Sequence, residues 1–119
     1  MLEVIFYRDD RDRLGAVAAG GHANFGDYGE DIVCAAVSAV LQAARLGVSE
    51  FAPSGVVARQ ESGQFKIEVS AAARDRESVR AILATAELAV EQIAFRYPGH
   101  VRIVRAKLEA PREAGSAGG

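Results

Sequence analysis

The sequence contains a single cysteine, Cys34. One cysteine excludes an intrachain disulfide and any metal site built from several cysteines. No stretch approaches the roughly 20 consecutive apolar residues of a membrane-spanning helix, so we expect no membrane partner. The chain starts without a basic segment followed by an apolar one, which predicts that it carries no secretory signal. These features are typical of the reducing cytoplasm, and we expect the protein there.

Positive charge is not in excess in this chain. The formal net charge is -2, the pI is about 5.7, and Lys66 and Lys107 are the two lysines. Binding to nucleic acid by neutralising phosphates needs clustered lysine and arginine and usually a pI above about 9. Arginine and aspartate are instead interspersed in the segment 8–13, which is typical of a solvated turn. We therefore expect no direct nucleic-acid partner.

The chain is long enough for one domain and too short for two. It has 119 residues, of which 50% are hydrophobic and 25% charged, so wholesale disorder is excluded. A chain of this size buries roughly two-thirds of its unfolded surface and needs no metal or disulfide to fold. We assign residues 1–109 to one domain. Residues 110–119, rich in glycine, alanine and charge, are predicted to form a disordered tail.

Short, largely apolar segments bounded by turn residues predict five strands. In the fourth strand, Phe65, Ile67 and Val69 alternate with polar neighbours, so one face of that strand is exposed. Short turns join the first two strands and the next two, which predicts two hairpins. The predicted strands are residues 2–7, 14–19, 56–60, 65–70 and 101–107.

Two segments show the 3.6-residue periodicity of a helix with one buried face. The first is 30–46, with acidic residues at its start and Gly47 as C-cap. The second is 76–96, with Asp75 as N-cap and a Tyr-Pro-Gly sequence at its end. The expected order is β-β-α-β-β-α-β. Two helices packed on one mixed or antiparallel sheet of about five strands bury both apolar stripes, which is an α+β fold.

Chemistry-bearing side chains concentrate in the segment 20–38, which holds the cysteine and one of the two histidines. Cys34 lies near the start of the first predicted helix, where N–H groups and the helix dipole lower the pKa of a thiol from about 8.5. His22 lies on a glycine turn that lets its ring face the helix start. An imidazole near a thiol supplies a base for a nucleophile, and helix-terminal N–H groups stabilise an oxyanion. The pair indicates a cysteine acyl-transfer site.

Neighbouring residues fit supporting roles. Asp31, Cys34 and Ser38 are spaced i, i+3 and i+7, so they share one stripe at the edge of the buried helix face. A carboxylate beside a thiolate would raise the pKa of the thiol, so Asp31 is better suited to hold His22 or the loop backbone. Ser38 can hydrogen-bond the sulfur or a helix carbonyl.

The residues alone leave other interpretations open. A lone cysteine on a helix is commonly a small buried hydrophobic residue, and His22 beside two glycines can be an ordinary turn residue. Four candidate metal ligands can be assembled, but their spacing matches no established zinc pattern, so we expect neither a metal nor another cofactor. These four residues are His22, Asp27, Asp31 and Cys34.

Three short elements then stand in a fixed order: GHA at 21–23, Gly29, and DIVCAAVS at 31–38. Together they resemble the signature of the ribosomal-processing cysteine proteases, the Prp family. The layout of two hairpins, a long second helix and the last strand is similar as well. The resemblance covers about residues 1–108.

The resemblance implies a catalytic dyad of Cys34 as nucleophile and His22 as general base and acid. Asp31, Ser38 and Gly21 are the candidate supporting residues. It implies removal of a short N-terminal extension from large-subunit ribosomal protein twenty-seven, by a cut after two phenylalanines, for ribosome maturation. It also implies a homodimer, and a loop between histidine and cysteine that orders around substrate. The matching loop residues here are Asn24, Phe25, Gly26, Asp27, Tyr28 and Gly29.

Aromatic side chains in this loop have two interpretations: Phe25 and Tyr28 cap the core, or they line a groove for apolar substrate side chains. Two other classes of function also stay open for the whole chain. In one, the domain binds the ribosomal-protein extension without cutting it. In the other, Cys34 is a redox sensor whose thiol is oxidised to sulfenic acid.

Overall fold

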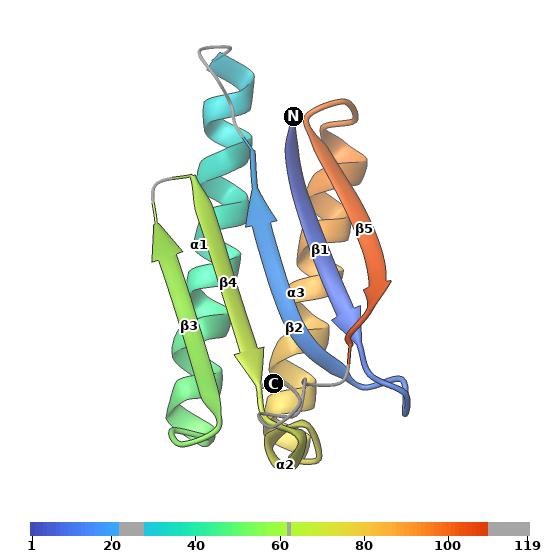
Figure 1. Cartoon of the computed structure of the whole chain (residues 1–119). Helices are drawn as coiled ribbons and strands as arrows, with labels where there is room; N and C mark the ends of the chain where they lie inside the picture. The colour runs from blue at the N-terminus through green and yellow to red at the C-terminus, as the bar shows by residue number, and fades with distance from the viewer. Residues whose placement is uncertain (22–27, 62, 110–119) are drawn as a thin grey trace, which may run out of the picture.

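Five strands form one sheet, and the helices cover one of its faces, in the computed structural model (Figure 1). The structure describes residues 1–21, 28–61 and 63–109, with the backbone alone for 28–31. The predicted α+β order is confirmed, and the one-turn helix α2 is an addition. The elements are β1 (Leu2–Arg8), β2 (Leu14–Gly20), α1 (Tyr28–Phe51), β3 (Val56–Glu61), β4 (Gln64–Val69), α2 (Ala71–Arg74), α3 (Glu77–Arg96) and β5 (Val101–Lys107).

The sheet is mixed, with the strand order β3-β4-β2-β1-β5. Both predicted hairpins are present as antiparallel neighbours, and β2 pairs with β4 to join them. β5 returns beside β1 in parallel, after the crossover through α3. In register, Phe6 pairs with Val17 and Val17 with Ile67, and all three side chains are buried. Because paired residues share a face, these side chains mark the helix-covered face of the sheet.

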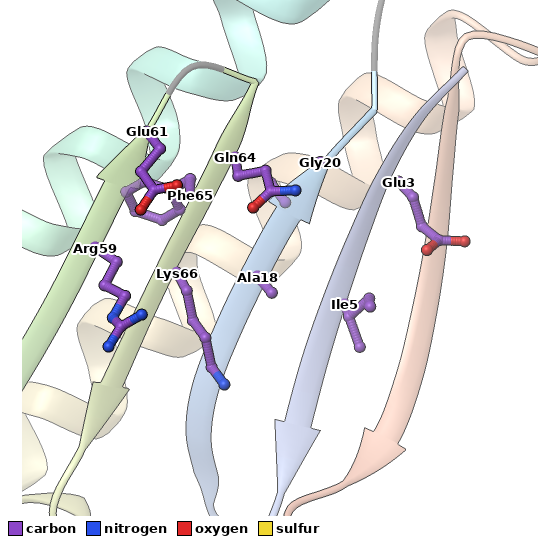
Figure 2. A pocket seen from close by; sticks show the side chains of 10 residues that line it. Glu3, Ile5, Ala18, Gly20, Arg59, Glu61, Gln64, Phe65 and Lys66 are labelled. Carbon is purple, nitrogen blue, oxygen red and sulfur yellow. The ribbon is translucent and has the colours of Figure 1, made fainter.

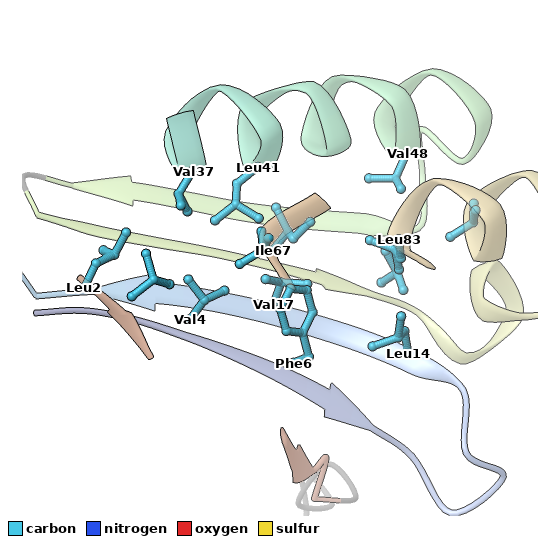
Figure 3. Close-up of a cluster of buried hydrophobic side chains, with 14 of the residues drawn as sticks. Leu2, Val4, Phe6, Leu14, Val17, Val37, Leu41, Val48, Ile67 and Leu83 are labelled. Carbon is cyan, nitrogen blue, oxygen red and sulfur yellow. The ribbon is translucent and has the colours of Figure 1, made fainter. Parts of the chain in front are cut away.

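The core lies between this face and the two long helices (Figure 3). Val37 and Leu41 of α1 are each 1% exposed, as the predicted stripe requires, and Val48 extends the buried face beyond the predicted end of the helix. Leu83 of α3 is also 1% exposed and belongs to the same cluster. The apolar stripes that the sequence predicts are therefore the surfaces that hold the two layers together.

Gly47 does not cap the first helix, so that prediction is wrong. α1 runs from Tyr28 to Phe51 and passes through Gly47. A Cβ atom at Gly47 would lie 3.1 Å from Cδ1 of Ile82 on α3. The glycine is therefore suited to the close approach of two helices rather than to a chain reversal. Sequence alone does not separate these two uses of glycine, because both lie next to an apolar stripe.

Asp75 is not the N-cap of the second long helix, which corrects another prediction. α3 begins at Glu77, and its N-cap, Arg76, makes no side-chain capping bond. Asp75 is instead the C-cap of the extra helix α2, whose N-cap Ser70 accepts a hydrogen bond from the N–H of Ala73. The carboxylate of Asp75 pairs with Arg13. Asp75 therefore lies before the start of α3, where it pairs with Arg13 and does not cap the helix.

The segment 8–13 is more ordered than the solvated turn predicted from it. Oδ1 of Asp9 accepts hydrogen bonds from the backbone N–H groups of Arg11 and Arg13, at 2.9 and 3.0 Å. Its Oδ2 accepts from the guanidinium groups of Arg13 and Arg74, at 3.0 and 3.1 Å. Burial alone would raise the pKa of Asp9, but these hydrogen bonds outweigh it and hold that pKa well below its ordinary range.

Arg8 extends the same group of charges across to α3. It donates two hydrogen bonds to the carboxylate of Glu87, at 2.7 and 2.9 Å, and Arg105 donates a third at 3.0 Å. The bonds from Arg8 lower the pKa of Glu87 despite its burial, and the bond from Arg105 adds to this. We call these charged residues the ionic cluster. Its members are Arg8, Asp9, Arg13, Arg74, Asp75, Glu87 and Arg105.

One helix, Ile32–Phe51 within α1, is long and apolar enough to cross a membrane by length and composition. This helix does not appear in the sequence as an uninterrupted apolar run, because polar residues interrupt it. Its buried stripe packs on the sheet, although 28% of the apolar window is buried. A single helix of this kind is weak support for a membrane span, because helices that pack on a core pass the same test. The predicted tail, 110–119, lies outside the described residues.

Candidate active site

Cys34 is the seventh residue of α1 and lies in its second turn. Its side chain is half-buried and packs against the edge of the core, next to the buried Val33 and Val37. Ser38, one turn further along, is exposed. The predicted stripe at the margin of the buried face is therefore confirmed for Cys34 and Ser38. The side chain of Asp31 lies outside the described residues.

A groove of about 200 Å³ opens beside Cys34, between α1 and the end of the sheet where β2 finishes and the β3–β4 hairpin turns. We call it the Cys34 groove. Its apolar part is formed mainly by side chains from β1, α1 and β4: Leu2, Val37, Leu41 and Phe65. Its polar part comes from α1 and the hairpin: Ser38, Gln42, Gln60, Glu61 and Gln64.

Gly21 also lines this groove and is required there as a glycine. Its φ angle is +92°, a left-handed conformation that favours glycine. A Cβ atom at this position would lie 2.8 Å from the carbonyl oxygen of Met1. The chain therefore leaves β2 at the groove, and the next residue in the sequence is His22. The structure thus brings Gly21, Cys34 and Ser38 together, whereas His22 lies outside the described residues.

A second hollow, of about 380 Å³, lies on the opposite face of the sheet (Figure 2). It forms because the small residues Ala18 and Gly20 of β2 lie between longer side chains, Ile5 on β1 and Lys66 on β4. This hollow and the Cys34 groove share part of their lining, including Gly20 and Gln64. Both faces are therefore open at the same end of the sheet.

Two glutamines that sequence analysis missed connect α1 with β3 at the groove. Nε2 of Gln42 donates to Oε1 of Gln60 at 2.7 Å, and Nε of Arg45 donates to Oε1 of Gln42 at 3.1 Å. One signal was available, because Gln42 is eight residues after Cys34 and so follows it on the same stripe. The part played by Gln60 depends on the strand order, which places β3 beside β4 and puts Gln60 opposite Phe65.

Comparison with known proteins shows which family the chain belongs to. The family model described as "Cysteine protease Prp" matches residues 1–102. The chain belongs to the Prp family of ribosomal-processing cysteine proteases. A comparison with curated protein sequences gives no match.

Several solved structures are similar to this chain over most of its length. The essential ribosomal processing protease Prp of Staphylococcus aureus, in complex with a substrate peptide, is 25% identical with a TM-score of 0.79. The alignment covers 88% of this chain and 99% of that one. The same protease with a covalently linked product peptide is 26% identical, with a TM-score of 0.76 and the same coverage. The protein SMU.848 of Streptococcus mutans is 28% identical with a TM-score of 0.79, over 91% of this chain and 96% of that one.

The start of α1 differs from the loop that sequence analysis predicted. Tyr28 and Gly29 are helical, so for these two residues the prediction of a loop is wrong. The other predicted loop residues, Asn24, Phe25, Gly26 and Asp27, lie outside the described residues. The helix begins earlier than expected, which leaves Cys34 beyond its first turn. Because a helix terminus stabilises charge mainly within its first turn, its effect at Cys34 is smaller than the sequence suggested.

The described residues contain no group of three histidine, cysteine, aspartate or glutamate side chains that could hold a metal. Of the four candidate ligands considered from the sequence, His22, Asp27 and the side chain of Asp31 lie outside the described residues. What the described groove provides is a half-buried thiol beside an apolar cleft with an amide-rich rim. That arrangement suits a nucleophile acting on an extended peptide.

Proposed function

We propose that this Prp-family protein is a cysteine endopeptidase in which Cys34 is the nucleophile and His22 the general base and acid. Its substrate is large-subunit ribosomal protein twenty-seven with an N-terminal extension, which it cuts after paired phenylalanines. The same proposal includes a homodimer and a cytoplasmic location. Asp31, Ser38 and Gly21 support the dyad, and residues 24–29 contact the substrate.

The observation that carries this proposal is the shared groove of Cys34 and Gly21. Cys34 is the one cysteine in the sequence, and Gly21 directly precedes the histidine of the family motif. The left-handed conformation of Gly21 turns the chain at the groove where β2 ends, which supports a role for the histidine that follows it in the sequence. Two solved S. aureus Prp structures hold a substrate peptide and a covalently linked product peptide. A peptide substrate at this groove is consistent with both.

The reaction follows from the two side chains. His22 takes the thiol proton, and the Cys34 thiolate attacks the carbonyl carbon of the second phenylalanine, forming a carbon–sulfur bond. The peptide carbon–nitrogen bond breaks, and the His22 imidazolium gives its proton to the leaving amine. Water, deprotonated by His22, then attacks the thioester. This step releases the extension as a carboxylic acid and returns the thiol to Cys34.

The apolar part of the groove supports the choice of an aromatic residue before the cut. Leu2, Val37 and Leu41 are at most 9% exposed, so the groove floor is continuous with the core. Phe65 adds an aromatic ring that a substrate ring can contact edge-to-face or offset-stacked. Burial of an aromatic side chain there also removes water from around the thiol.

The test is a cleavage assay read by mass spectrometry. The substrate is the host's ribosomal protein twenty-seven with its extension, incubated with wild type, with Cys34→Ala and with His22→Ala. We expect wild type alone to give a new N-terminus after the paired phenylalanines. A wild-type rate of cutting by either variant would show that the dyad is assigned wrongly.

Intact substrate in every tube would reject the peptidase. In that case, binding of the extension by wild type with its thiol reduced would identify a non-catalytic binding domain. Peroxide oxidation of Cys34 far faster than that of free cysteine, without binding, would identify a redox sensor. Each class of function therefore gives a different result with the same protein preparation.

A further inference from the structure

We infer that the hydrogen-bonded pair Gln42–Gln60 closes the far end of the Cys34 groove and limits which side chain fits before the cut. The inference rests on the proposed function. It assigns these two residues as specificity determinants and restricts the preferred substrates to peptides with a single aromatic ring, or an apolar side chain of similar length, at that position.

The position of the pair along α1 gives the groove its length. Cys34, Ser38 and Gln42 are each four residues apart and lie on one stripe of the helix. At a rise of about 1.5 Å per residue, Gln42 is roughly 12 Å from Cys34 along the helix axis. Side chains at all three positions line the groove, so it extends from the thiol to the glutamine pair.

The pair is a crosslink between the two layers of the fold. Gln42 belongs to α1 and Gln60 to β3, and their amides meet at 2.7 Å. Gln42 is half-buried, and Arg45 orients its amide by donating to Oε1. Gln60 is exposed. It lies on the helix-covered face of the sheet, because paired residues share a face and its register partner Phe65 lies on that face. The amides therefore bridge the groove where α1 and the hairpin approach each other.

The chemistry of the groove changes at this bridge. Between Cys34 and the bridge, the floor is apolar and includes Val37, Leu41 and Phe65. A substrate side chain that reached past the floor would have to separate two amides that satisfy each other. The pair is exposed in the free protein, but a bound side chain that parts the amides also covers them and keeps water from replacing the lost bond, which disfavours that side chain. A one-ring side chain stays on the apolar floor, whereas a second ring meets the amides.

The experiment compares two peptides that differ only at the residue before the cut, Phe in one and 4-phenylphenylalanine in the other. The measured quantity is the ratio of their kcat/KM values with wild type, Gln42→Ala and Gln60→Ala. We expect wild type to prefer Phe, and each alanine variant to shift the ratio toward the two-ring peptide by at least ~10-fold.

Two control variants separate the bridge from general damage. Gln60→Glu retains an acceptor for Nε2 of Gln42 and should keep the ratio within about twofold of wild type. Gln92→Ala removes a glutamine on α3, away from the groove, and should leave both kcat/KM values unchanged. Thermal unfolding of all variants checks folding, since the bridge is an exposed bond whose loss should change stability little.

The outcomes separate this inference from the proposed function. If wild type cuts the Phe peptide but the alanine variants give the same ratio of kcat/KM values as wild type, the bridge does not set specificity. The proposed peptidase function is unaffected by that result. A fall in both kcat/KM values with a constant ratio also overturns the inference, because it shows a purely structural bridge. If folded wild type cuts neither peptide nor the extended ribosomal protein, the peptidase itself is rejected and the bridge with it.

Discussion

The two ends of the sheet are built from different kinds of interaction. At one end, the ionic cluster joins the β1–β2 turn, α2, α3 and β5, and its charged groups are paired with one another. At the other end, the N-terminus of β1, the end of β2, the start of α1 and the β3–β4 turn surround the Cys34 groove (Figure 1). The first end is held by paired charges, whereas the polar side chains at the second end are mostly uncharged and line an open space.

With the proposed function, this contrast predicts that stability and catalysis are carried by separate parts of a small fold. The core between the layers is shared, but changes at the ionic end should affect unfolding and spare cleavage. Changes at the groove end should slow cleavage and leave unfolding unaffected. The following predictions test this division, beginning with the largest effect.

Replacing Cys34 should abolish cleavage without unfolding the protein. Removal of a catalytic nucleophile typically costs at least ~10³-fold in kcat/KM. Cys34→Ala should show such a loss, whereas Ser38→Ala, on the same stripe, should lose about tenfold or less. Steady-state cleavage of a Phe-Phe peptide and thermal unfolding of both variants measure the two effects. An equal loss in both variants would mean that the stripe, and not the thiol, carries the activity.

Gly21→Ala should affect both properties, because Gly21 belongs to the groove and has a backbone conformation in which an alanine would be strained. A left-handed conformation costs an alanine about 1–2 kcal/mol, and the contact with the Met1 carbonyl adds to this. Gly99→Ala is the matched control, since its φ is +90° but its Cβ would meet nothing within 4 Å. We expect about 3 kcal/mol of destabilisation for Gly21→Ala and about 1 kcal/mol for Gly99→Ala by urea denaturation. Only the first should also slow cleavage.

Glu87→Ala should destabilise the protein by about 2 kcal/mol, because it leaves Arg8 and Arg105 without their shared carboxylate. Glu91→Ala is the control one turn further along α3. It pairs with Arg105 in a more exposed position and should cost about 0.5 kcal/mol. Urea denaturation measures both. The kcat/KM of folded enzyme should stay at the wild-type value, and a tenfold fall in Glu87→Ala would contradict the division between the two ends.

The smallest effect concerns pH. The pKa of Asp9 is lowered in the folded state, so its stabilising contribution is present above its unfolded pKa of about 3.9 and is lost as the pH falls toward the folded value. The free energy of unfolding of wild type should therefore drop between about pH 5 and pH 3. In Asp9→Asn the drop should be smaller. A parallel pH dependence in the two proteins would show that the hydrogen bonds to Asp9 do not stabilise its charge.

The sequence predicted those elements of the fold whose buried faces leave a periodic pattern of apolar residues along the chain. The alternation of Phe65, Ile67 and Val69 marked β4, and the stripe through Val37 and Leu41 marked α1. Cys34 was recognisable because it lies in a motif at the edge of that stripe. Local patterns could not show that Gly47 allows the two helices to approach, since that role depends on Ile82, far away in the sequence.

The same limit applies to the groove. Its glutamine bridge joins residues 18 positions apart, on elements that meet only because of the strand order. Asp75 was misassigned for a related reason, because its partner Arg13 is 62 residues away. Long-range pairs of polar side chains leave no periodic trace in the sequence, whereas buried faces do.

The most direct test of the division between the two ends is covalent labelling of Cys34. A peptide chloromethyl ketone ending in Phe-Phe should add one peptide to the chain, as the thiolate displaces chloride, and the adduct is read by intact mass spectrometry. We expect Glu87→Ala to label at the wild-type rate, and His22→Ala at least ~10-fold more slowly. Equal rates in wild type and His22→Ala, or no adduct on a thiol that still reacts with iodoacetamide, would contradict a Cys34–His22 protease at this groove.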